Sequence, residues 1–269
     1  MKLVRDVMWL SACWVVVLIA GCAANPGAVS NTGGRSEIMT ESDETDGRKR
    51  ARIRLELAAN YFQQGQTNVA LDELKQALTA DPTYADAHNL RGLVYMRLND
   101  NALAEDSFRR ALALNPRDGD VLHNYGWLLC QQAKYAESSA MFARAVATPN
   151  YGGQPKTLMT QGICQMRAGQ LAEAERSLAQ SYELDAGNPL TGYNLASLLF
   201  QRGDFRRAQF YIRRLNNSNL ANAETLWLGV KVERSLGDRE AMLQLAGQLT
   251  RRFGSSREAA AYDKGAFNE

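Results

Sequence analysis

The stretch LAANYFQQGQTNVALDELKQALTADP, residues 57–82, returns in altered form as RGLVYMRLNDNALAEDSFRRALALNP, residues 91–116. The matched positions, each 34 residues apart, are Ala58–Gly92, Tyr61–Tyr95, Ala70–Ala104, Leu74–Phe108, Ala77–Ala111 and Pro82–Pro116. A constant offset of this size indicates an internal repeat, in which each unit is a small supersecondary element that stacks on the next.

The period and the order of small, aromatic and large residues resemble the tetratricopeptide repeat, a hairpin of two antiparallel helices. One hairpin cannot bury its own apolar face, so neighbouring hairpins must stack into a solenoid. We therefore expect an all-α fold, a tetratricopeptide-repeat solenoid of six helix-turn-helix units. The units are expected at residues 51–84, 85–118, 119–152, 155–188, 189–221 and 222–255, followed by a C-terminal tail at 256–269.

The period is interrupted between the third and fourth repeats by TPNYGGQP, residues 148–155, which contains two Gly and two Pro. A segment this rich in helix breakers predicts a loop. The loop is either an insertion without a further role or one edge of a binding surface.

The first 21 residues have the pattern of a secretory signal, because a basic start precedes an apolar stretch at residues 7–20. This stretch is shorter than the roughly 20 apolar residues of a transmembrane helix. It ends in Ile19-Ala20-Gly21-Cys22, which resembles a bacterial lipobox. The resemblance implies that Cys22 is acylated and becomes the mature N-terminus. The alternatives are an ordinary signal with a chance cysteine, or an uncleaved anchor.

Residues 22–50 are rich in Asn, Gly, Ser, Thr and charged residues, which predicts a flexible tether after the lipidated cysteine. Alanines rather than an aspartate follow Cys22. By analogy with lipoprotein sorting in enteric-type bacteria, we expect a lipid-anchored protein on the periplasmic face of the outer membrane. The lipid on Cys22 is the only non-protein group expected, and no cofactor is predicted.

The composition argues against nucleic-acid binding and catalysis. Lys and Arg number 31 against 29 Asp and Glu, a net charge of +2 without the basic stripe that nucleic acid requires. No Ser-His-Asp order, HExxH, phosphate loop or Cys-x-x-Cys motif is present. His88 and His123 lie about one repeat apart, and we expect them to be polar structural or groove residues rather than a metal or acid–base pair. The protein is therefore predicted to be neither an enzyme nor a metal-binding protein.

Cys130 and Cys164 remain in the mature chain and lie on the first helices of neighbouring repeats. An oxidising compartment would permit a disulfide between them. Their predicted helix faces differ, however, so we expect buried or groove thiols.

Trp127 falls at a position that should face the concave surface of the solenoid. Apolar surface that is contiguous on a soluble domain marks a contact site, and aromatic residues and Met are enriched at such sites. Asn124 and Asn194 could pair with the backbone of a bound segment. The predicted partner-binding groove comprises Asn89, Leu93, Met96, His123, Asn124, Trp127, Ile163, Met166, Tyr193, Asn194 and Phe200. The alternatives are that residues 256–269 fill this groove, or that the helical frame is shifted by one residue.

The third repeat contains VLHNYGWLLCQQAKYAES, residues 121–138, followed by a Pro149–Tyr151 break and a helix with Gly162 and Cys164. These features, after a lipobox and tether, resemble the PilF/PilW family of type IV pilus biogenesis and stability lipoproteins. The chain departs from the family's pattern at His123, where Asn is usual, and at Thr160-Gln161, where Asn before the Gly is usual.

The resemblance implies a pilotin-like role for a monomeric protein. The lipoprotein would bind the outer-membrane secretin of the type IV pilus in its groove and promote the localisation or multimer assembly of that secretin, with pilus stability and twitching motility as the outcome. Trp127 would anchor the secretin segment, at about 2 kcal/mol for truncation to Ala. The alternative is a repeat-containing envelope lipoprotein that regulates cell-wall enzymes or scaffolds other assemblies.

Overall fold

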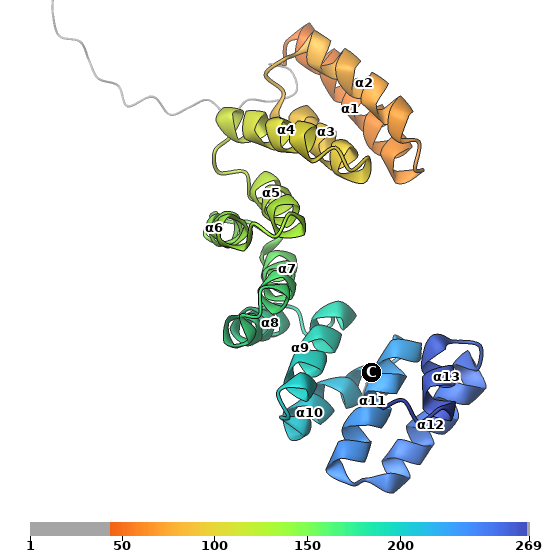
Figure 1. Ribbon diagram of the computed structural model, residues 1–269. Coiled ribbons are helices and arrows are strands. Elements are labelled where there is room, and N and C mark those ends of the chain that lie inside the picture. The colour runs from red at the N-terminus through yellow and green to blue at the C-terminus, as the bar shows by residue number, and fades with distance from the viewer. Residues whose placement is uncertain (1–43, 268–269) are drawn as a thin grey trace, which may run out of the picture. The chain divides into compact units, whose positions relative to one another are not determined.

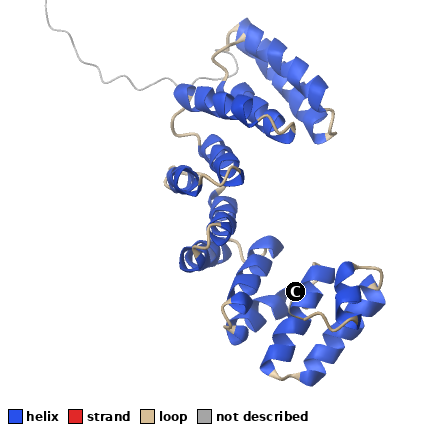
Figure 2. Cartoon of the chain, viewed as in Figure 1, coloured by secondary structure: helices blue, strands red, loops and turns tan. Residues whose placement is uncertain are grey.

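The computed structural model describes residues 44–267, which form helices joined by short turns (Figure 1). Figure 2 shows no strand among these residues. The thirteen helices are α1 (Asp46–Gln63), α2 (Thr67–Ala80), α3 (Ala85–Arg97), α4 (Asn101–Leu114), α5 (Gly119–Gln131), α6 (Tyr135–Val146), α7 (Gln154–Arg167), α8 (Leu171–Leu184), α9 (Pro189–Gln201), α10 (Phe205–Asn216), α11 (Ala223–Leu236), α12 (Arg239–Phe253) and α13 (Arg257–Asp263).

The first twelve helices pair into six hairpins, α1–α2 through α11–α12, and each hairpin packs on the next. The first helices, α1, α3, α5, α7, α9 and α11, contact one another in series. The backbones of the second helices approach only first helices among those twelve. In Figure 1, α6 and α8 accordingly lie on the same side of α5 and α7. The hairpins thus form two layers, and one surface of the first-helix layer points away from the second helices.

The two helices of a hairpin cross where a small residue of the first helix meets a large residue of the second. Gly92 of α3 lies against Phe108, and a Cβ atom at Gly92 would come within 2.5 Å of the Phe108 ring. Gly126 stands in the same relation to Phe142. Both phenylalanines are fully buried, so the absence of a Cβ atom on the first helix creates the space that the ring fills.

Each hairpin turn contains one residue with positive φ. Four of the six are glycines, Gly65, Gly169, Gly203 and Gly237, with φ between 75° and 78°. The other two are Asn99 (φ 60°) and Ala133 (φ 57°). Glycine adopts this left-handed conformation without steric cost. The turn chemistry therefore ends each first helix at the same point of the repeat.

The tether was predicted to extend to residue 50, but α1 already begins at Asp46. Thr45 caps this helix, because its hydroxyl accepts a hydrogen bond from the Arg48 amide at 3.1 Å. Arg48 then pairs with Asp81 and lies over the ring of Tyr84 at 4.4 Å. Arg48, which falls within the predicted tether, thus belongs to the first turn of the first hairpin.

The C-terminal segment, predicted as a tail at 256–269, includes the short helix α13. Ser256 caps α13, which packs on α11 and α12. Phe267 lies 5.3 Å from the ring of Trp227, and Arg234 stacks over Phe267 at 3.8 Å. This segment therefore covers the apolar surface that the last hairpin would otherwise expose, as the end of a repeat array requires.

None of the helices within residues 44–267 is both long enough and apolar enough to span a bilayer. The predicted signal peptide, the lipobox and Cys22 lie outside the described residues.

Substituting Gly92 with Ala should lower the free energy of unfolding by about 1–3 kcal/mol, because the new methyl group must displace the Phe108 ring. Gly152→Ala is the matched control, since nothing lies within 4 Å of a Cβ atom there and its φ is not in the left-handed region. Urea unfolding followed by circular dichroism measures both. Equal stability of the two variants would contradict the close crossing.

Candidate functional site

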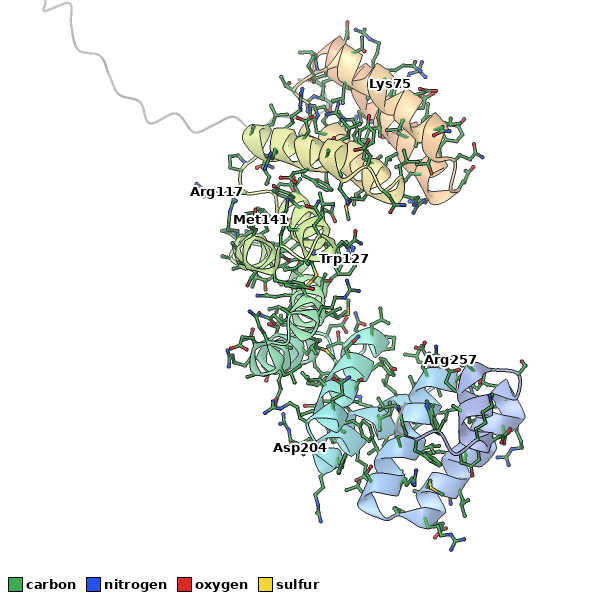
Figure 3. All side chains as sticks on the ribbon, viewed as in Figure 1. Lys75, Arg117, Trp127, Met141, Asp204 and Arg257 are labelled. Atoms are coloured by element: carbon green, nitrogen blue, oxygen red, sulfur yellow. A yellow bond between two sulfur atoms is a disulfide. The ribbon has the colours of Figure 1, made fainter. Side chains whose placement is uncertain are left out.

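The first helices have one surface that points away from the second helices, which we call the first-helix face. The eleven residues predicted to line a groove are carried by α3, α5, α7 and α9, which all belong to this layer. Ten of them are partly exposed, and the exception is His123. Figure 3 labels Trp127 on the side of α5 that faces away from α6.

Trp127 stands at the edge of a small cluster formed by α5, α6 and α7. It packs with Tyr135 against the cluster of Cys130, Phe142 and Cys164. The guanidinium carbon of Arg167, from the next first helix, lies 5.0 Å from the centre of the indole ring. The ring is therefore held from two sides, by apolar packing and by a cation, and remains partly exposed.

The asparagines of the predicted groove already have partners. The Nδ2 atom of Asn124 donates to Oδ1 of Asn89 at 3.1 Å, which links α5 to α3. The Nδ2 atom of Asn194 donates to the backbone oxygen of Leu190 at 2.7 Å. Because a carboxamide has two N–H groups and an acceptor oxygen, each keeps hydrogen-bonding capacity for a ligand.

The prediction that Cys130 and Cys164 are thiols is wrong, because the two form a disulfide. Their Cα atoms are 5.9 Å apart, and the cysteines are 34 residues apart in the chain. The insertion before α7 places equivalent residues, such as Gly126 and Gly162, 36 residues apart here, so the two cysteines occupy different positions of their repeats. Such residues can meet because neighbouring parallel helices touch through opposite sides. The difference between the predicted helix faces is thus a condition for the bond and not an argument against it.

The assignment of His123 to the groove is also wrong. Its side chain is 5% exposed, and its Nδ1 atom lies 2.9 Å from the hydroxyl oxygen of Thr157 on α7. Burial lowers the pKa of His123 to about 4, and the charge of Lys156 acts in the same direction. The imidazole is therefore neutral at physiological pH and belongs to the α5–α7 contact. His88 is buried as well, and residues 44–267 contain no group of His, Cys, Asp and Glu side chains arranged to hold a metal ion.

The loop at residues 148–155 is anchored between α5 and α7 by Tyr151. Cβ atoms on Gly119 and Gly153 would lie 2.5 and 2.4 Å from the aromatic side chain, so both glycines admit it. The Tyr151 hydroxyl lies 3.2 Å from the Thr157 hydroxyl and 3.4 Å from Asp120. The insertion thus contributes packing to the junction between the third and fourth hairpins.

The first-helix face extends to α11, which carries none of the eleven predicted groove residues. A hollow of about 490 Å³ lies between α9, α11 and the C-terminal segment. Its lining includes Tyr193, Phe200, Trp227, Lys231, Arg257 and Phe267. The C-terminal segment therefore reaches the first-helix face at the last hairpin, which is the alternative that sequence analysis left open, but only at this end. The aromatic residues Trp227 and Phe267 were the signal for it.

The repeat pattern is matched by family profiles described as TPR repeat, at residues 60–99, and tetratricopeptide repeat, at residues 85–118, 107–138 and 165–225. A solved structure of PilW, titled a widely conserved type IV pilus biogenesis factor, is similar to this chain with a TM-score of 0.72 and 30% identity. The match covers 79% of this chain and 97% of that one. The chain belongs to the PilF/PilW family. It is also 29% identical to the type IV pilus assembly protein PilF of Pseudomonas aeruginosa over 231 residues, which are 84% of this chain and 92% of that protein. A solved structure of that PilF gives a TM-score of 0.73 at 26% identity, covering 82% of this chain and 100% of the other.

Reduction of the disulfide in this PilF/PilW-family chain should lower the free energy of unfolding by about 3–4 kcal/mol, as expected for a cross-link that closes a 34-residue loop. Urea unfolding of the purified protein with and without reductant measures the difference. A Cys130→Ala/Cys164→Ala variant is the control and should not respond to reductant. A wild-type protein equally stable in both conditions would contradict the prediction.

The burial of His123 predicts a loss of stability in acid. The imidazole has a pKa of about 4 when folded and 6.5 as an unperturbed group, so the unfolded chain binds the proton first. The contribution of the neutral His123 to the free energy of unfolding is complete above pH 6.5. It falls by about 3 kcal/mol as the pH drops to 4. His123→Asn removes the titrating group, whereas His88 titrates in both proteins. The pH dependence of urea unfolding should therefore be shallower in the variant, and identical slopes would show that His123 is not the source.

Proposed function

We propose that this chain is an outer-membrane lipoprotein that acts in type IV pilus biogenesis by binding the pilus secretin through the first-helix face. Binding would bring secretin subunits to the outer membrane or promote their assembly into the multimer. The chain acts as a binding scaffold and performs no reaction. The names of PilF and PilW, a pilus assembly protein and a pilus biogenesis factor, support the setting.

The membrane attachment in this proposal is the lipid on Cys22. Residues 23–43 would join the lipid to the first hairpin, and a chain of this length spans at most about 75 Å when fully extended. Such a reach lets the repeat array search the space beneath the membrane while it stays attached. Acyl chains provide the affinity, at about 0.8 kcal/mol for each buried methylene group.

The observation that carries the proposal is the row of partly exposed apolar side chains on consecutive first helices. Leu93 and Met96 lie on α3, Trp127 on α5, and Ile163 and Met166 on α7. Partial burial holds these side chains in place, so a partner that covers them gains apolar contact without ordering them first. Trp127 stands at the centre of this row and is the residue most suited to anchor a partner.

Truncation of Trp127 to Ala should weaken secretin binding by about 2 kcal/mol, or about 30-fold in Kd. Phe210→Ala is the matched control, because Phe210 is 62% exposed on α10 in the second-helix layer. Binding of each purified variant to the periplasmic region of the secretin is measured by calorimetry. The control should bind like wild type.

The cellular test is an unheated gel of outer membranes from cells that lack the gene, probed for the secretin multimer. Wild type and Phe210→Ala should restore the multimer, and Trp127→Ala should restore it poorly. An intact multimer in the correct membrane without the gene would refute the proposal. Altered cell shape with normal twitching motility would point to the regulation of cell-wall enzymes.

A further inference from the structure

Cations of the first helices lie over aromatic rings of the preceding first helix at three junctions. Arg97 of α3 lies 3.8 Å from the centre of the Phe62 ring on α1. Arg167 of α7 covers Trp127 of α5 at 5.0 Å. The ammonium group of Lys231 on α11 lies 5.6 Å from the Phe200 ring on α9. The arrangement thus recurs at alternate junctions along the first-helix layer.

The two arginines of this series differ from the arginines of the described chain that are held by carboxylates. Ion pairs elsewhere include Arg54–Glu73, Arg110–Asp106, Arg176–Glu173, Arg207–Glu175 and Arg213–Glu233. Within residues 44–267, Arg97 and Arg167 form no ion pair. Arg97 instead donates a hydrogen bond to the backbone oxygen of Phe62 at 2.6 Å. Both guanidinium groups are exposed and keep donors for an incoming acceptor.

A guanidinium stacked on a ring is prepared to bind a carboxylate. The ring restricts the long side chain, so less conformational entropy is lost when a ligand arrives. The planar group presents parallel N–H donors that match the two oxygens of a carboxylate. The exposed remainder of the aromatic side chain beside it accepts apolar contact. Each pair therefore offers an anion site and an apolar site side by side.

Charge is distributed unevenly across the first-helix layer. Arg97 and Arg167 lie in the last turns of α3 and α7, whereas Asp86 and Asp120 lie in the first turns of α3 and α5. Burial, followed by the charge of Asp118, raises the pKa of Asp86, and Asp120 adds to the shift. The start of α3 and of α5 is thus acidic, whereas α3 and α7 end in a cation; Lys156 lies in the first turn of α7. A polyanion such as nucleic acid or an anionic lipid surface would be repelled by Asp86 and Asp120, while a polypeptide can place its carboxylates beside Arg97 and Arg167 only.

We propose that the first-helix face binds a polypeptide segment that is both acidic and apolar. Its Asp or Glu side chains would contact Arg97 and Arg167, and its apolar side chains would contact Trp127 and the partly exposed residues beside it. The inference deepens the proposed function, because it specifies the chemistry of the segment that a secretin or another partner would supply.

Two synthetic peptides of equal length test the preference without any secretin. Phe and Leu alternate with Glu in one peptide and with Lys in the other, and each carries a fluorophore. Fluorescence anisotropy with the full mature chain should show about tenfold tighter binding of the Glu peptide at low salt, as expected for a pair of charge-assisted contacts. High salt should reduce the preference. Equal binding, tighter binding of the Lys peptide, or binding of neither peptide would overturn the proposal.

The variants assign the preference to the two arginines. Arg97→Gln/Arg167→Gln keeps polar side chains on both rings and should abolish the preference for Glu. Arg206→Gln, on the second-helix layer, makes a control that removes a cation of the same type and should keep the preference. A preference retained in the double variant would overturn the proposal. Failure of the secretin to bind wild-type protein, with the peptide preference intact, would refute the proposed function alone.

Discussion

The close crossing of the two helices within each hairpin is the constraint on which the rest of the structure depends. A glycine or alanine of the first helix admits a large side chain that lies 16 residues later in the chain, on the second helix. The pairs are Ala58–Leu74, Gly92–Phe108, Gly126–Phe142, Gly162–Leu178, Ala196–Ile212 and Gly229–Leu245. Because the large side chain lies between the two helices, each hairpin has its own core, and its outer apolar residues remain for the contact with the next hairpin.

A layered array follows from that crossing, and its two surfaces have different chemistry. The second helices and the outer edges carry paired charges, such as Arg110 with Asp106, which keep that surface soluble but contribute little stability. The first-helix face instead combines partly exposed apolar side chains with cations that stack on aromatic rings. A surface that is ordered without a partner and has unused hydrogen-bond donors is suited to recognition, because its side chains lose little conformational entropy when a partner binds.

The junction between the third and fourth hairpins departs most from the regular period, and it carries a covalent cross-link. The insertion adds residues between α6 and α7, which by itself would weaken the stacking. Three interactions hold α5 and α7 together across it, namely the Cys130–Cys164 disulfide, the His123–Thr157 hydrogen bond and the packing of Tyr151. Trp127 lies at this junction, so a covalently cross-linked part of the array carries the residue that we propose as the anchor.

The sequence alone determined the fold class, the period and the assignment of the candidate residues to first helices, because these depend on local patterns of small and large side chains along one chain. It did not determine how far each helix is rotated about its axis relative to the next, since that depends on packing between hairpins. This rotation directs His123 into the contact with Thr157 and brings Cys130 to Cys164. The packing of Phe267 on Trp227 joins two segments that lie 40 residues apart in the chain, so only the tertiary structure shows it.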